Sequence, residues 1–96
     1  MKKPHHTERF SSFVRSELAD FLRDELYCEK GVVVSIFNVE SASSEGRVKV
    51  LVSVWPESHR SGVAKQLHLL ENKAKTYLAK HLNRKYAVSV HFYVME

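Results

Sequence analysis

The chain is 96 residues long, which allows one domain with a single hydrophobic core but not two. Hydrophobic residues make up 44% and charged residues 27% of the sequence, a balance that is typical of globular proteins and excludes a disordered chain. The formal net charge is +4 at neutral pH, and no apolar run approaches the ~20 residues that cross a bilayer. The one cysteine, Cys28, cannot form an internal disulfide, so we expect a cytoplasmic protein without a membrane partner.

The first predicted element is a long amphipathic helix that follows a short tail over residues 1–6. Thr7 is suited to cap its N-terminus, and no glycine or proline occurs between there and Gly31. Apolar residues recur at spacings of three and four, which is the signature of one buried helical face. They are Phe10, Phe13, Val14, Leu18, Phe21, Leu22 and Leu26. The tail has no apolar segment after its basic residues, which argues against a secretory signal.

After this helix the apolar period changes to two, which predicts strands. Residues 32–39 are β-branched and aromatic, residues 41–46 form a small polar turn, and residues 47–55 place valine at every second position. The two segments predict an antiparallel hairpin, and Pro56 ends it because proline has no amide donor for the ladder. Residues 86–94 alternate in the same way and predict a third strand.

A second helical region, over residues 63–83, separates the hairpin from the last strand. Its apolar stripe consists of Leu67, Leu70, Ala74, Leu78 and Leu82. Periodicity does not decide whether this region is one helix, a bent helix or two helices. The order of elements predicts an α+β domain over residues 7–96, in which helices pack on one face of a three-stranded sheet. Because a helical crossover leads to the last strand, that strand can run parallel to its neighbour.

The excess positive charge lies in this second helical region and in the residues that follow it. Residues 58–96 carry seven basic and two acidic side chains, whereas the rest of the chain is close to neutral. The clustered cations, which oppose the single acid Glu71, are Lys73, Lys75, Lys80, Arg84 and Lys85. A basic helix face is typical of proteins that bind polyanions. The alternative interpretation is a solvated helix face without a partner.

Several short patterns follow one another in an order and at a spacing that are typical of a known protein family. In the first helix the matching residues are Arg9, Phe13, Val14, Glu17, Leu18, Phe21, Leu22 and Leu26. Further along, the matches are Gly31-Val32, Val39-Glu40, the run over residues 49–54, and Asn72-Lys73-Ala74 followed by Tyr77-Leu78. Together these patterns resemble ribosome-binding factor A. The resemblance covers about residues 7–95, and no single part of it is a catalytic signature.

The resemblance implies a type-II KH-like domain of order α-β-β-α-α-β that binds the small (30S) ribosomal subunit and its 16S rRNA. Members of the family assist late maturation of that subunit and processing of its RNA, notably in the cold, and are not enzymes. KH domains clamp nucleic acid with a GXXG loop, which in this family is replaced by an Ala-X-Gly bend that corresponds here to residues 74–76. Thr76 stands at the glycine position, so we expect a kink within two residues of Lys75 that is made without glycine. A hydrogen bond from the Thr76 hydroxyl to the preceding turn is one way to make it.

RNA contacts are therefore predicted in and after this bend. The predicted contact residues are Lys73, Lys75, Thr76, Lys80, Arg84 and Lys85. Weaker candidates are Arg9, Arg47, Lys49 and Tyr86, of which Tyr86 is the one aromatic residue that we expect to stack on a base. The expected partners are the small subunit and its RNA, and a single domain with mixed surface charge is compatible with a monomer.

No pattern predicts an enzyme, a cofactor, a small-molecule substrate or a metal site. The six histidines lack the spacing of metal ligands, and Cys28 has no neighbouring base that would activate it. We assign most of Trp55, Tyr77, Phe92 and Tyr93 to the core, because aromatic residues at these spacings usually pack inside. Two alternatives remain open: a protein-interaction module whose basic face meets an acidic partner, and a KH-like RNA binder outside ribosome assembly.

Overall fold

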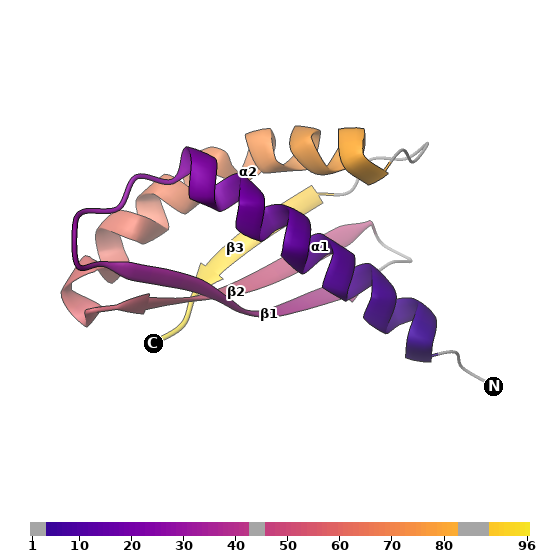
Figure 1. Ribbon diagram of the computed structural model, residues 1–96, viewed down its shortest axis with the longest axis horizontal. Coiled ribbons are helices and arrows are strands. Elements are labelled where there is room, and N and C mark those ends of the chain that lie inside the picture. The colour runs from indigo at the N-terminus through magenta and orange to yellow at the C-terminus, as the bar shows by residue number, and fades with distance from the viewer. Residues whose placement is uncertain (1–3, 43–45, 83–88) are drawn as a thin grey trace.

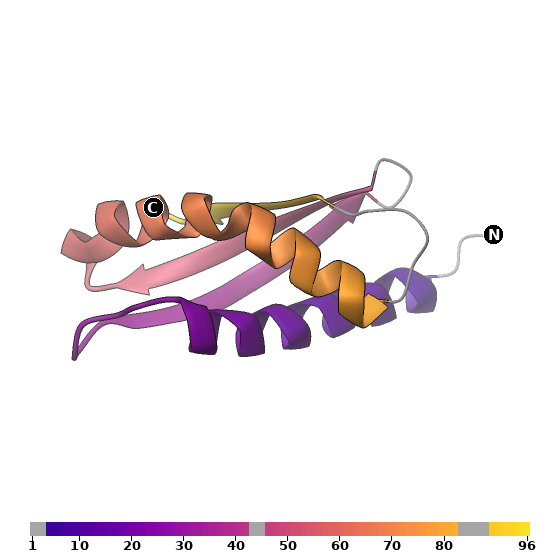
Figure 2. The ribbon, with the colours of Figure 1, turned by 90° about the horizontal axis from the view of Figure 1, so that it is seen from above.

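The computed structural model describes residues 4–42, 46–82 and 89–96, with side chains placed for residues 10–40, 46–81 and 89–96. Its elements are α1 (Pro4–Glu25), β1 (Val33–Ala42), β2 (Arg47–Trp55), the short 3-10 helix η2 (Glu57–His59), α2 (Arg60–Leu82) and β3 (Ser89–Val94). Helix α1 packs mainly on β1 and helix α2 mainly on β3, as the ribbon shows from two directions (Figures 1 and 2). The predicted α+β fold, with helices on one face of a three-stranded sheet, is confirmed.

The boundaries of the elements differ from the predicted ones by a few residues. Helix α1 begins at Pro4, ahead of the expected start near Thr7, and a proline is tolerated in a first helical turn because its missing amide has no intrahelical partner there. Strand β1 continues to Ala42, beyond the predicted end at Val39. The first three residues of the predicted last strand, 86–88, lie outside the described residues.

The sheet has the order β1-β2-β3, with β2 in the centre. Strands β1 and β2 form the predicted antiparallel hairpin, which pairs Val33 with Trp55 at one end and Ala42 with Arg47 at the other. Strand β3 runs parallel to β2, because the chain crosses over through α2 before it returns to the sheet. The register of β1 shifts between Ile36 and Asn38, which places a bulge at Phe37.

The hydrophobic core lies between the sheet and the two helices. Strand β2 buries every second residue against the helices and turns the intervening residues away from them, as the period of two requires. The core residues are Val14, Leu18, Phe21, Leu22, Val39, Val48, Val50, Val52, Val54, Val63, Leu67, Ala74, Leu78, Val90 and Phe92. Each buried Val, Leu or Phe side chain favours folding by about 1.5–3 kcal/mol relative to exposure, so this layer holds α2 and its charged surface in place.

Helix α2 is one continuous helix rather than the two separate segments that the order α-β-β-α-α-β implies. Its path changes direction in the middle, which is visible in both views (Figures 1 and 2). The Thr76 hydroxyl donates a hydrogen bond to the backbone oxygen of Asn72 at 3.2 Å, as predicted, and such bonds bend helices. No glycine or proline follows Gly62 within α2, so the backbone hydrogen bonds continue through the bend instead of breaking there.

Candidate nucleic-acid interface

The outward side of α2 is formed by Asn72, Thr76 and Lys80, which we call the α2 ridge. These residues are spaced by four and therefore lie along one side of the helix, and all three are exposed. Lys73 and Lys75 lie on opposite flanks of the ridge, because two residues turn about 200° around a helix. The structure thus brings Thr76 and Lys80 together, and it separates Lys73 from Lys75.

The flank of α2 that carries Lys73 faces helix α1. The Lys73 ammonium forms an ion pair with Glu25 of α1, with Nζ and Oε1 2.8 Å apart. About two helical turns before Lys73, Gln66 donates a hydrogen bond to the backbone oxygen of Tyr27 at 2.7 Å and accepts one from the Tyr27 amide at 3.0 Å. Lys73 therefore already has a protein partner, which reduces the charge that it offers to a phosphate.

Helix α1 presents further acids toward this flank. Burial raises the pKa of Tyr77, and the nearby carboxylates of Glu17, Asp20 and Asp24 raise it further, because each disfavours the phenolate. The His81 Nε2 atom lies 3.9 Å from Oε1 of Glu17. The field between the two helices is consequently more negative than the charge of α2 alone predicts, and it works against a polyanion on the α1 side.

The opposite flank of α2 lies beside the edge strand β3. Here Glu71 accepts a hydrogen bond from the backbone amide of Phe92, at 2.9 Å from N to Oε2. The same carboxylate lies 3.2 Å from Nδ1 of His68, through Oε2, and 3.9 Å from Nδ1 of His91, through Oε1. Lys75 follows Glu71 by one turn and is half-buried on this side. Glu71 thus accepts a hydrogen bond from a backbone amide at the edge of the sheet, and without Glu71 this amide could pair with a further strand.

Replacement of Glu71 separates its role as a hydrogen-bond acceptor from its charge. In Glu71→Ala the partly buried Phe92 amide loses its partner, and we expect the free energy of unfolding to fall by about 1–3 kcal/mol. In Glu71→Gln the amide oxygen still accepts that bond, so the loss should stay below about 1 kcal/mol. Urea denaturation of both variants measures the difference, and equal losses would contradict a role for the Phe92 hydrogen bond.

The remaining predicted contact residues are placed as follows. Arg84, Lys85 and Tyr86 lie outside the described residues, and Arg9 lies in α1 with its side chain outside the described set. Arg47 and Lys49 are exposed on β2, on the face of the sheet that points away from the helices. The Lys49 ammonium lies 5.2 Å from the centre of the Tyr93 ring, a cation–π distance.

The assignment of aromatic residues to the core is correct for Phe92 and wrong for two others. Phe92 is 1% exposed, and Tyr77 is half-buried against Phe21 with ring centres 5.2 Å apart. Trp55 is 66% exposed and Tyr93 47% exposed. The alternation of β2 could have predicted the exposure of Trp55. Position 55 lies on the same face of the strand as Arg47 and Lys49, opposite the buried valines.

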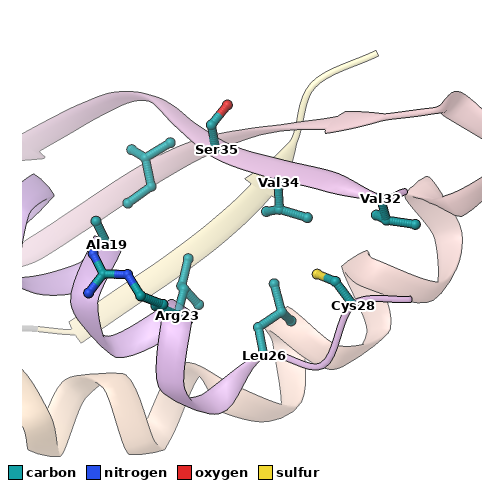
Figure 3. Close-up of a pocket in the computed structure, with 9 residues that line it drawn as sticks. Ala19, Arg23, Leu26, Cys28, Val32, Val34 and Ser35 are labelled. Atoms are coloured by element: carbon teal, nitrogen blue, oxygen red, sulfur yellow. The ribbon is translucent and has the colours of Figure 1, made fainter. Parts of the chain in front are cut away.

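A separate pocket of about 500 Å³ lies between the end of α1 and the edge strand β1 (Figure 3). Its lining is mostly apolar and includes Leu26, Val34 and Cys28. Burial raises the pKa of the Cys28 thiol, which keeps it protonated and weakens it as a nucleophile. The one cation in the lining, Arg23, is paired with Asp20 at 2.9 Å. The pocket therefore lacks the features of a phosphate site.

The described residues contain no group of three or more His, Cys, Asp or Glu side chains that could hold a metal ion. Neither described helix combines the length and the apolar character that a membrane span requires.

Comparison with known proteins relates the whole fold to one group of structures. No protein-family model matches the sequence, and no curated protein matches it. A Thermotoga maritima structure assigned to ribosome binding factor A superposes with a TM-score of 0.79 at 21% identity, over 97% of this chain and 90% of that one. Ribosome-binding factor A from Thermus thermophilus superposes with a TM-score of 0.74 at 14% identity, over 92% of this chain and 93% of that one. The chain therefore has the KH-like fold of ribosome-binding factor A.

Proposed function

We propose that this chain is a ribosome-binding factor that binds the folded RNA of the small subunit during its late maturation and assists processing of 16S rRNA. The observation that carries the proposal is the fold, which follows two structures of ribosome-binding factor A over more than nine-tenths of the chain. The sequence patterns that resemble this family, from the first helix to Asn72-Lys73-Ala74, support it independently.

RNA binding is assigned to the α2 ridge and its β3 flank. Lys75 and Lys80 have no carboxylate partner among the described residues, and Arg84 and Lys85 continue the basic sequence beyond α2. These side chains neutralise phosphates and release counterions. Lys73 contributes less, because Glu25 already balances its charge.

The mechanism is positional rather than catalytic. Lysine side chains contact the phosphate backbone and carry no direct sequence information, so the protein recognises the shape and charge of folded RNA. A domain docked in this way holds immature RNA in one arrangement until processing is complete. Thr76, whose hydroxyl donates a hydrogen bond to the backbone oxygen of Asn72, lies between Lys75 and Lys80 in this proposed contact.

Sedimentation of a cell extract through a sucrose gradient tests the proposal. We expect the protein to migrate with free small subunits at low salt and to leave them as salt is raised, because phosphate contacts are screened. It should be absent from mature ribosomes and polysomes, which no longer contain immature RNA. A protein that stays at the top of the gradient at low salt, or that follows polysomes, would contradict the proposed function.

A further inference from the structure

The sheet has an uncovered side, opposite the helices, which we call the open face. Because β2 alternates, the open face receives its odd-numbered residues, including Lys49, Leu51 and Trp55. Four large apolar side chains on β1, β2 and β3 are strongly exposed in the structure. They are Val33 at 58%, Phe37 at 58%, Trp55 at 66% and Tyr93 at 47%. An exposed apolar surface of this kind marks an interaction site.

Strand register shows how these side chains are arranged. Leu51 is opposite Tyr93 of β3 on one side and opposite Asn38, beside the bulged Phe37, on the other. An apolar row therefore crosses all three strands. Two rows further along β2, at about 13 Å, Trp55 is paired with Val33.

Serine hydroxyls separate the two apolar rows. Charged groups lie on the other side of the row that contains Leu51. Ser35 and Ser53 are paired through a 2.9 Å hydrogen bond between their hydroxyls. In the opposite direction, Lys49 is paired with Glu40 and with His91. Arg47 follows at the end of β2. Among the described residues, the open face thus combines aromatic rings with the cations Lys49 and Arg47 and with the acid Glu40.

Two details favour a ligand with flat rings and negative charge. The bulge at Phe37 breaks the register of β1, and bulges re-aim side chains that the regular pleat would place elsewhere. The Lys49 ammonium lies over the Tyr93 ring, 5.2 Å from its centre, so a base that stacks on this ring displaces the ammonium from the ring face toward the phosphate of that base. A second copy of this chain fits less well, since it would bring Lys49 and Arg47 against like charges.

We propose that the open face binds single-stranded RNA, with bases stacked on Phe37, Tyr93 and Trp55 and with phosphates beside Lys49 and Arg47. Sheets that carry exposed aromatic residues bind two or three unpaired bases in this way. The inference rests on the proposed function for its choice of an RNA partner. It adds a second surface, so that α2 contacts folded RNA while the sheet holds an adjacent unpaired segment.

Trp55 provides a direct probe, because it is the single tryptophan of the chain. The full chain is titrated with an oligouridylate of about 12 nucleotides, and separately with an RNA duplex of equal length, at about 0.1 M salt. We expect the single strand to quench Trp55 fluorescence through stacking and the duplex to leave it nearly unchanged, because paired bases do not expose their faces.

Substitutions on the open face test the stacking partners. Phe37→Ala and Tyr93→Ala should each weaken binding of the oligouridylate by about fivefold or more. The matched control is Leu69→Ala, which removes an 84% exposed side chain from α2 and should leave this affinity unchanged. Lys49→Met should make the slope of log affinity against log salt shallower by about 0.7, as expected for the loss of one phosphate contact on a single strand.

The outcomes separate this inference from the proposed function. If the oligouridylate leaves Trp55 fluorescence unchanged while the protein migrates with small subunits, the open-face site is wrong and the proposed function stands. Quenching that Phe37→Ala weakens, without migration with small subunits, supports the open-face site and contradicts the proposed function. Concentration-dependent dimerisation that Phe37→Ala abolishes would show an interface between copies and overturn the inference.

Discussion

Phe92→Ala is expected to lower the free energy of unfolding by about 3–5 kcal/mol, the usual cost of truncating a buried phenylalanine. Phe92 is 1% exposed and lies on β3, which α2 covers. The substitution removes apolar contacts and leaves a cavity beneath that helix. Domains of this size are typically stable by about 5–15 kcal/mol, so the loss is a large fraction of the total, and we expect the variant to unfold at a clearly lower urea concentration.

Urea denaturation of the purified protein measures this loss. Tyr93→Ala is the matched control, because it truncates an aromatic residue on the same strand that points to the open face and is 47% exposed. The control should lose about 1 kcal/mol or less, since exposed side chains away from the core contribute little to stability. Equal losses in the two variants would contradict the assignment of β3 faces.

The double variant Lys75→Glu/Lys80→Glu is expected to reduce affinity for small-subunit RNA by on the order of tenfold or more at low salt. Both lysines flank the exposed Thr76, and each reversal replaces an attraction to phosphate with a repulsion. Lys73 is left unchanged, because a glutamate there would face Glu25 and disturb the contact between α1 and α2. Since two phosphate contacts are lost, the slope of log affinity against log salt should also fall by about two.

Filter binding of small-subunit RNA at increasing salt measures both quantities. Lys30→Glu is the matched control, because it makes the same charge reversal at an exposed residue. Lys30 belongs to the connection between α1 and β1, and this connection lies away from the middle of α2 (Figure 1). Its affinity should change much less than that of the double variant. Unchanged affinity of the double variant, or a flat salt response of the unsubstituted protein, would rule out the α2 ridge and its β3 flank as the RNA contact.

Most of the fold follows from local patterns in the sequence. The apolar period of helix α1 and the alternating valines of β2 each specify one element. Their order leaves few ways to cover a small sheet, so the arrangement was predictable as well. The two helical segments that the order α-β-β-α-α-β implies are absent, because α2 has no glycine or proline after Gly62 that would break its backbone hydrogen bonds.

The candidate site was predictable in composition and not in geometry. The sequence placed the lysines on one helix, but α1 decided that Lys73 would be neutralised by Glu25, 48 residues earlier in the chain. In the same way, the partner of the Phe92 amide is Glu71 of α2, which no local pattern indicates. Such contacts join side chains from different elements, and they depend on the angles at which those elements pack.

The sequence by itself determined the elements, most of the buried stripe of each helix and the concentration of positive charge after residue 57, because these depend on spacing along the chain. Phe13, which the spacing assigned to the buried stripe of α1, is 37% exposed. Only the tertiary structure decided which cations face solvent and which aromatic residues leave the core. Trp55, Phe37 and Tyr93 are exposed because both helices pack on the other face of the sheet and one layer of helices cannot cover two faces.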